Sequence, residues 1–162
     1  MGKAAQLRIN LVERALGGLD RIARHRRPGP ELPAHLITGY AGEDTAFFYL
    51  RRKGYTVVAR RWSSGDVRGD VDMIAWQGDL LCFIEVKTRT AHDMTPAESA
   101  VGSHKRAVLR RLARRYVRQL PQPLPPEVRF DVISVYLVTG QKPEVTHFEA
   151  AFSWSDFDPR DR

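Results

Sequence analysis

The chain has 162 residues, a length typical of one domain rather than two. Hydrophobic residues make up 43% and charged residues 28%, close to globular averages, which argues against wholesale disorder. A single cysteine excludes an intrachain disulfide framework and a cysteine-rich zinc site. No apolar run reaches the length of a membrane span, and the first residues lack the apolar segment of a signal peptide. We therefore expect a cytoplasmic protein.

The positive charge of the chain is unevenly distributed. There are 26 Lys and Arg residues against 19 Asp and Glu, a net charge of +7. Residues 1–37 carry seven bases and three acids, and residues 99–126 carry seven bases and no acid. This asymmetry favours a polyanionic partner without membrane contact, although solvated helix faces on a basic protein would give the same pattern.

The predicted elements alternate between helical and strand patterns. In chain order they are a helix over 3–27, a proline-rich linker over Pro28–Pro33, a helix over Thr38–Lys53, strands over Tyr55–Trp62, Asp70–Trp76 and Leu80–Thr88, a helix over Ala97–Leu120, and strands over Val128–Val138 and Glu144–Phe152. The order α-α-β-β-β-α-β-β predicts an α/β (mixed α+β) fold, in which helices flank a mixed central sheet. We expect a basic helical extension and linker over 1–37, a folded domain over 38–153 and a tail over 154–162.

An acid lies on the apolar face of the second predicted helix. Glu43 shares this face with three apolar residues at helical spacing, Ala46, Phe47 and Leu50. Burying an unpaired carboxylate costs several kcal/mol, so Glu43 needs a partner or a function. An ion pair near the helix start would explain it equally well.

Two neighbouring strands carry further charges. Glu85 and Lys87 follow the apolar run 80–84 and share one strand face. In the preceding strand, one face is predicted to hold Asp70, Asp72, Ile74 and Trp76. A tight turn over 77–79 makes the two strands neighbours, so we expect Asp72 to lie close to Glu85.

These charges suit a metal-dependent reaction at a phosphate. Carboxylate oxygens are ligands for Mg²⁺ or Mn²⁺, and such a metal polarises a phosphoryl oxygen and activates water. We expect Asp72 and Glu85 to hold the metal, and Glu43 to bind it directly or through water. Lys87 would orient the attacking water or neutralise transition-state charge. The alternative is a structural cluster of ion pairs.

Four segments of the chain resemble the YraN-like family of uncharacterised bacterial proteins. They are GYAGEDTAFFYLRRKGY, GDVDMIAWQGDLLCFIEVKTRT, AVGSHKRAVLRRLARRYV and RFDVISV, and the resemblance runs from about Gly39 to Phe152. It implies a PD-(D/E)xK nuclease-like domain, with the restriction-endonuclease-like core also found in archaeal Holliday-junction resolvases. It further implies a metal-dependent phosphodiesterase site. Because many proteins of this fold act as dimers, a homodimer is an expected assembly.

The same four charged residues match the motif positions of this family. Glu43 matches the acid on the first core helix, Asp72 matches the motif aspartate, and the (D/E)xK pair corresponds to Glu85 and Lys87. Family members usually have Gly-Glu where this chain has Gly69-Asp70. Asp70 is one methylene shorter, and we assign it a supporting position beside the metal ligands.

The predicted helix Ala97–Leu120 has a basic side. Five arginines are predicted to share it: Arg110, Arg111, Arg114, Arg115 and Arg118. Such a face, without acids, suits a phosphate backbone. Lys105 lies on the apolar side instead, from which it can reach the carboxylates, and we expect it to contact a phosphate. We expect Asp131 to support the core, and His104 and His147 to lie on the surface.

These patterns leave three hypotheses for function. The first is a Mg²⁺- or Mn²⁺-dependent endonuclease that hydrolyses DNA, including branched or single-stranded forms. The second is a nucleic-acid-binding module that keeps the nuclease fold without turnover. The third is an adaptor whose arginine face docks RNA or an acidic protein.

Overall fold

The computed structural model describes residues 33–91, 101–121 and 126–154. Within them, two helices and five strands follow in the predicted order. They are α2 (Ala34–Arg52), β1 (Thr56–Ser64), β2 (Val67–Gln77), β3 (Leu80–Arg89), α3 (Ser103–Val117), β4 (Val128–Tyr136) and β5 (Glu144–Phe152). The helix expected over 3–27 and nearly all of the predicted linker and tail lie outside the described residues.

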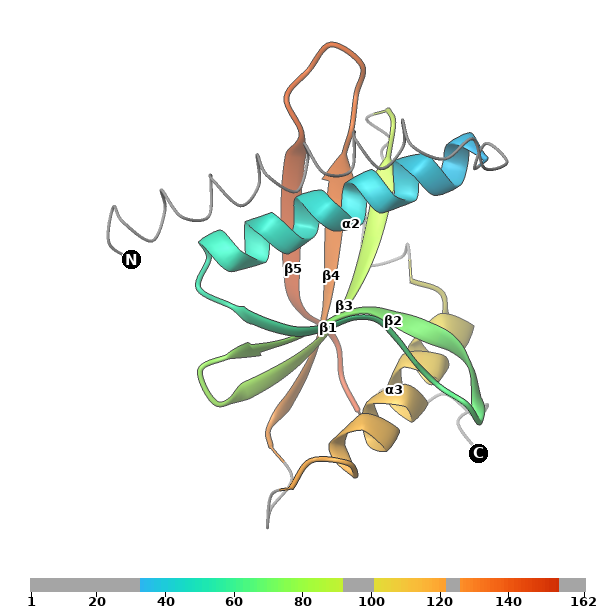
Figure 1. Cartoon of the computed structure of the whole chain (residues 1–162), viewed down its shortest axis with the longest axis vertical. Helices are drawn as coiled ribbons and strands as arrows, with labels where there is room; N and C mark the ends of the chain where they lie inside the picture. The colour runs from blue at the N-terminus through green and yellow to red at the C-terminus, as the bar shows by residue number, and fades with distance from the viewer. Residues whose placement is uncertain (1–32, 92–100, 122–125, 155–162) are drawn as a thin grey trace, which may run out of the picture.

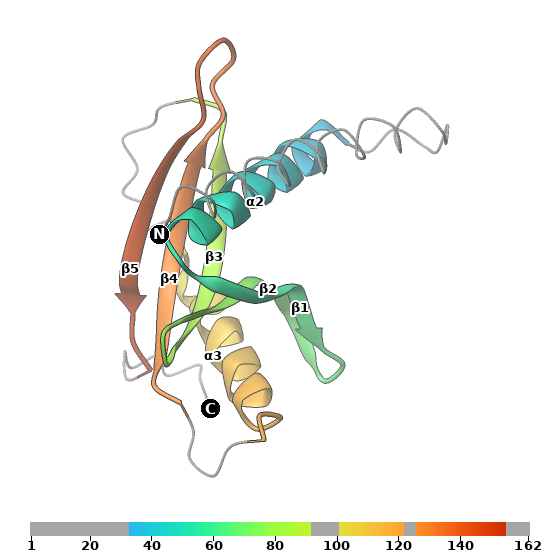
Figure 2. The ribbon, with the colours of Figure 1, turned by 60° about the vertical axis from the view of Figure 1, so that its left-hand side comes forward.

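The five strands form one mixed sheet in the order β1-β2-β3-β4-β5. Strand β3 pairs with β4 in parallel, and the other neighbouring strands pair antiparallel. A parallel pair needs a crossover, and α3 lies in the connection between β3 and β4. The two helices lie on opposite sides of the β1–β2 hairpin (Figures 1 and 2). The prediction of a mixed α/β fold with helices flanking the sheet is therefore confirmed.

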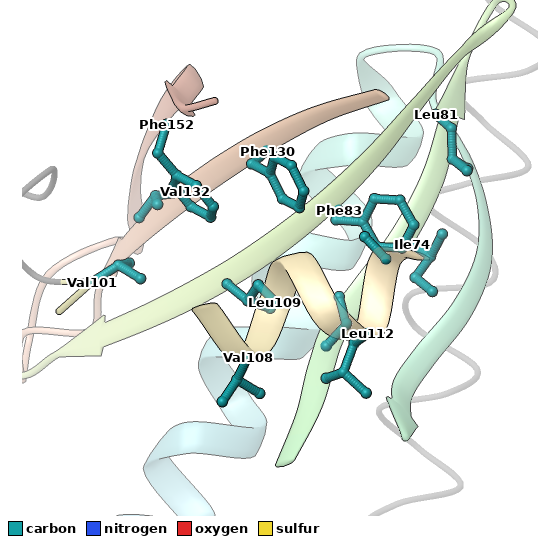
Figure 3. Close-up of a cluster of buried hydrophobic side chains, with 12 residues drawn as sticks. Ile74, Leu81, Phe83, Val101, Val108, Leu109, Leu112, Phe130, Val132 and Phe152 are labelled. Carbon is teal, nitrogen blue, oxygen red and sulfur yellow. The ribbon is translucent and has the colours of Figure 1, made fainter. Parts of the chain in front are cut away.

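Two apolar clusters hold the helices to the sheet. One joins α3 to the sheet and includes Phe83, Leu109 and Phe130 (Figure 3). The other lies under α2 and includes Leu50 and Ile84. Because β3 contributes to both clusters, the sheet is covered on either side of this strand, and most of β3 is buried.

Strand β3 alternates between the clusters as predicted, but β2 does not. Val71 and Ile74 pack in the same cluster, whereas regular alternation would place Val71 with Met73. The pairing of β2 with β3 extends from Gln77 only as far as Met73, opposite Ile84. The two strands separate beyond this point, so strict alternation of β2 fails there. We call the region beyond the last pair the strand fork, and Asp72 is the first residue of β2 inside it.

Several element boundaries differ from the predictions. Helix α2 begins at Ala34 rather than at Thr38, and the Thr38 hydroxyl donates within the helix to the Ala34 carbonyl (3.0 Å). Strand β2 begins at Val67, ahead of its predicted start at Asp70. No helix in the described ranges combines the length and the apolar character needed to cross a membrane.

Helix α2 packs unusually close to β3 at Gly42. A Cβ atom added to this buried glycine would lie 2.8 Å from the Cβ of Thr88, and closer still to its Oγ1. Real Cβ atoms do not approach other atoms this closely, so only glycine permits the contact. The contact sets the distance between Glu43, the next residue of α2, and the end of β3.

We expect Gly42→Ala to lower the free energy of unfolding by about 2 kcal/mol or more, because α2 must move away from β3 to relieve the overlap. Gly39→Ala on the same helix is the matched control. Nothing lies within 4 Å of its added Cβ, so the better helix propensity of alanine should stabilise the protein by about 0.5–1 kcal/mol. Urea denaturation measures both values, and equal effects of the two substitutions would contradict the close-packing account.

Candidate active site

An open pocket of about 510 Å³ lies where α2, β2 and β3 meet. Each of these elements contributes one carboxylate to its lining, namely Glu43, Asp72 and Glu85. The structure therefore brings together the three acids that the sequence singled out. The remaining lining is largely small and polar, with Thr38, Thr88 and Thr90 among it. The pocket therefore offers carboxylate and hydroxyl oxygens beside apolar surface.

Asp72 connects the two strands at the fork. The backbone N–H of Val86 donates to Asp72 Oδ2 at 2.6 Å, in place of a regular strand-to-strand bond. Burial and the nearby charge of Glu85 raise the pKa of Asp72 to about 7, although the Val86 N–H and the Lys105 ammonium oppose this change. The two carboxyl groups are therefore held close enough for one charge to disfavour the other.

Glu85 is only 3% exposed and lies between two lysines. The ammonium of Lys87 donates to Glu85 Oε1 at 2.9 Å, and the ammonium of Lys105 lies 3.1 Å from Oε2. The buried Oε2 atom accepts no hydrogen bond from the described residues. Both Lys87, on the same strand, and Lys105, on α3, thus face the predicted metal ligand.

Lys105 holds α3 to the strand fork. Its ammonium donates to the backbone carbonyl of Asp70 at 3.1 Å and lies 3.6 Å from Asp70 Oδ1. Burial lowers the pKa of Lys105, but the charges of Glu85, Asp72 and Asp70 outweigh burial and raise it. Lys105 therefore reaches the carboxylates as expected. Asp70 contacts Lys105, which in turn pairs with Glu85.

Glu43 is engaged by a neighbouring arginine. Arg61 Nε donates to Glu43 Oε2 at 2.6 Å, and the Arg61 guanidinium lies 3.9 Å from the centre of the Tyr40 ring. The backbone φ of Arg61 is 49°, in the left-handed region that a non-glycine residue rarely adopts. Glu43 thus lines the pocket and also makes the ion pair that was the alternative explanation for its place on the helix.

The donor atoms fit a divalent cation in their chemistry. As the side chains stand, no three His, Cys, Asp or Glu residues in the described segments are gathered as a ready metal cluster. Asp72 and Glu85 nevertheless provide hard carboxylate oxygens, of which Glu85 Oε2 is buried without a hydrogen bond. A cation between them would offset the repulsion that raises the pKa of Asp72. Glu43 could join them, although its Oε2 atom is bonded to Arg61.

The arginine face of α3 is smaller than predicted. Arg110 is 1% exposed, so its placement among the accessible arginines is wrong. Its Nε donates to the Ser153 carbonyl (2.9 Å), and its guanidinium lies over the Phe152 ring at 5.5 Å. The end of β5 covers this side of the helix, and helical periodicity alone cannot reveal that long-range contact.

The four other arginines of the predicted face are exposed, but two have partners. Arg115 pairs with Asp66 of the β1–β2 turn, and Arg114 lies 5.4 Å from the Trp154 ring centre. Within the part of the chain that the structure describes, Arg111 and Arg118 make no such contact. These two residues are therefore the most available side chains of α3 for a phosphate backbone.

A second buried charge cluster lies away from the pocket, around Asp131. Arg129 binds both carboxylate oxygens at 2.8 Å, the Ala150 N–H donates to Oδ1 at 2.9 Å, and His147 Nε2 lies 3.0 Å from Oδ2. Burial would raise the pKa of Asp131, but the hydrogen bonds with His147, Arg129 and the Ala150 N–H hold it below its usual value. Asp131 supports the core as predicted. The expected surface position of His147 is wrong, because its ring packs against Tyr55 and Asp131.

The residues of the site lie within a segment of the chain that matches a known protein family. A family model described as uncharacterised protein family UPF0102 matches residues 42–135, which include all the pocket carboxylates and both lysines. The chain is 49% identical over 125 residues to a UPF0102 protein of Koribacter versatilis, covering 77% of this chain and 85% of the relative. It is 43% identical over 136 residues to a UPF0102 protein of Solibacter usitatus, covering 84% and 95% respectively.

We expect Asp72→Asn to stabilise the metal-free protein at pH 8. The folded Asp72 keeps its proton up to about pH 7, whereas the unfolded residue loses it near 3.8, so its contribution to stability is lost as the pH rises through this interval. The amide cannot ionise, and the substitution should raise the free energy of unfolding by about 1–3 kcal/mol at pH 8 and by much less at pH 4.

Urea denaturation with a chelator at the two pH values provides the measurement. Asp44→Asn is the control, because the half-exposed Asp44 side chain pairs with Arg60 and the substitution should change stability by about 0.5 kcal/mol or less. The prediction is contradicted if Asp72→Asn lowers the free energy of unfolding by the same amount at pH 8 and at pH 4. The environment of Asp72 would then not disfavour its charge.

Proposed function

The chain belongs to the uncharacterised protein family UPF0102, as its YraN-like segments predicted. Since family membership names no reaction, we propose a function from the pocket itself. We propose that the protein is a divalent-metal-dependent endonuclease that hydrolyses phosphodiester bonds in DNA. The observation that supports this proposal is the meeting of Asp72 and buried Glu85 with two lysine ammoniums at the strand fork. Paired carboxylates beside amines match the chemical needs of phosphodiester hydrolysis.

The three pocket carboxylates and the neighbouring Lys87 have distinct roles in the proposed reaction. Asp72 and Glu85 would hold Mg²⁺ or Mn²⁺, and Glu43 would bind the metal directly or through water. When bound, the cation would polarise a phosphoryl oxygen and lower the pKa of a water molecule. Lys87 is anchored to Glu85 but its side chain is 34% exposed, so its ammonium can also donate to a water or a phosphate oxygen.

The basic surface supports a long polyanionic substrate. Arg111 and Arg118 are exposed on α3, on the other side of the β1–β2 hairpin from α2, whose first half lines the pocket (Figure 2). A substrate that contacts both regions must extend across the hairpin, which suits DNA, in duplex, branched or single-stranded form, better than a mononucleotide. We propose the cytoplasm as the compartment of this activity, and a homodimer as the assembly to test.

A second candidate function is nucleic-acid binding without turnover. It is favoured by the absence of a ready three-ligand metal cluster in the described segments, and by the ion pair that engages Glu43. In this case the same arginines bind the backbone and the pocket remains idle. An adaptor for RNA or an acidic protein would use the same face of α3, and parallel binding titrations with RNA, duplex DNA and branched DNA separate these partners.

We expect cleavage of plasmid, branched or single-stranded DNA in the presence of Mg²⁺ or Mn²⁺. Asp72→Asn, Glu85→Gln and Lys87→Met should each lower the rate about 100-fold or more, because each removes a charge needed at the phosphate. Asp44→Asn, outside the pocket, should keep the rate of the unaltered protein. Cleavage that persists in Asp72→Asn would indicate a contaminant, and no cleavage of any substrate would favour the binding module.

We also expect α3 to contribute to DNA affinity through charge. The double substitution Arg111→Ala, Arg118→Ala should weaken binding in chelator and reduce the slope of log affinity against log salt by about 2, since two phosphate contacts are lost. The matched control is Arg51→Ala, Lys53→Ala, which removes the same charge from the exposed end of α2. Equal losses in both double variants would indicate diffuse attraction rather than a binding face.

A further inference from the structure

The two oxygens of Glu85 are occupied unequally. Oε1 accepts a hydrogen bond of 2.9 Å from Lys87, a residue of the same strand. Oε2 faces the Lys105 ammonium at 3.1 Å but is buried without accepting a hydrogen bond from any described residue. The contact between Lys105 and Oε2 therefore rests on charge attraction rather than on a well-aligned bond. Among the described residues, the Lys105 ammonium is thus the counter-charge of Oε2.

Lys105 differs from Lys87 in where it comes from and what it touches. It reaches the fork from α3, and it also lies 3.6 Å from Asp70 Oδ1 and 3.1 Å from the Asp70 carbonyl. Its charge also acts on Asp72, whose environment includes both Glu85 and Lys105. A single ammonium thus compensates three acids of two strands, which is the position that a bound metal ion takes in an acidic site.

We propose that Lys105 is an internal counter-cation that neutralises the acidic pocket until a divalent cation displaces its ammonium from Glu85. This proposal rests on the proposed function, since it assumes that Asp72 and Glu85 bind a metal. An ammonium and a dication cannot share Oε2 without strong repulsion. The Lys105 side chain is 29% exposed and has four rotatable methylenes, so its ammonium can leave Glu85 while α3 stays in place.

A purely structural role for Lys105 makes a different prediction. If Lys105 only ties α3 to the strand fork, its removal should loosen the fork and weaken any metal site built there. If Lys105 competes for the site, its removal should strengthen metal binding. The sign of the change in metal affinity therefore separates the two roles.

The test is a titration of the full chain with Mn²⁺, followed by the electron paramagnetic resonance signal of the free ion. Lys105→Met should bind Mn²⁺ about tenfold more tightly than the unaltered protein, because a competing positive charge is gone. Lys105→Arg keeps the charge and should stay much closer to the unaltered protein. Arg111→Met removes the same charge from an exposed position of α3 and should change affinity less than about twofold.

Asp72→Asn assigns the bound ion to the pocket, since it should abolish the site in every background. Tighter binding in Lys105→Met, including binding that appears only in this variant, supports the proposal. Equal or weaker binding in Lys105→Met, with a site that still depends on Asp72, overturns the proposal and leaves the metal site intact. Binding in neither protein overturns both the counter-cation and the proposed metal-dependent function.

Discussion

The burial of Glu85 beside Asp72 is the constraint to which the rest of the pocket responds. Two carboxylates this close cannot both be charged without compensation, because the protein around them screens charge far less than water does. Two features of the fold provide the compensation. Lys87 and Lys105 each face one oxygen of Glu85, and the Val86 N–H holds Asp72 at the strand fork. A site with this balance is costly for folding and suited to binding a cation.

The scaffold brings these groups together through contacts that individually have little to do with charge. The close approach of α2 to β3 at Gly42 places Glu43 at the pocket, and the end of β2–β3 pairing leaves room for Asp72 to turn toward Val86. Apolar packing holds α3 on the sheet (Figure 3), and from this helix Lys105 reaches Asp70 and Glu85. The pocket therefore depends on how three packed elements lie together, not on a loop.

Much of the site was predictable wherever a local period governed it. The two-residue period of a strand predicted that Glu85 and Lys87 share a face, and helical spacing predicted that Glu43 faces the sheet. The misplacement of Arg110 has a different origin, because it depends on the end of β5, which is distant in sequence. An ion pair of Glu43 was an alternative from the start, but its partner Arg61 escaped prediction, since this contact requires an arginine in the left-handed region of an irregular strand. The spacing of residues in a sequence does not reveal long-range packing or irregular backbone conformations.

The central claim is that Asp72 and Glu85 form one cation site. Diffraction from crystals grown with Mn²⁺, recorded near the manganese edge, tests it most directly. The account predicts an anomalous peak within about 2.5 Å of a carboxylate oxygen of each residue. It also predicts that the Lys105 ammonium moves off Glu85 Oε2, which it approaches to 3.1 Å in the metal-free arrangement. Ordered Asp72 and Glu85 side chains with no peak between them, at a Mn²⁺ concentration that supports DNA cleavage, would contradict it.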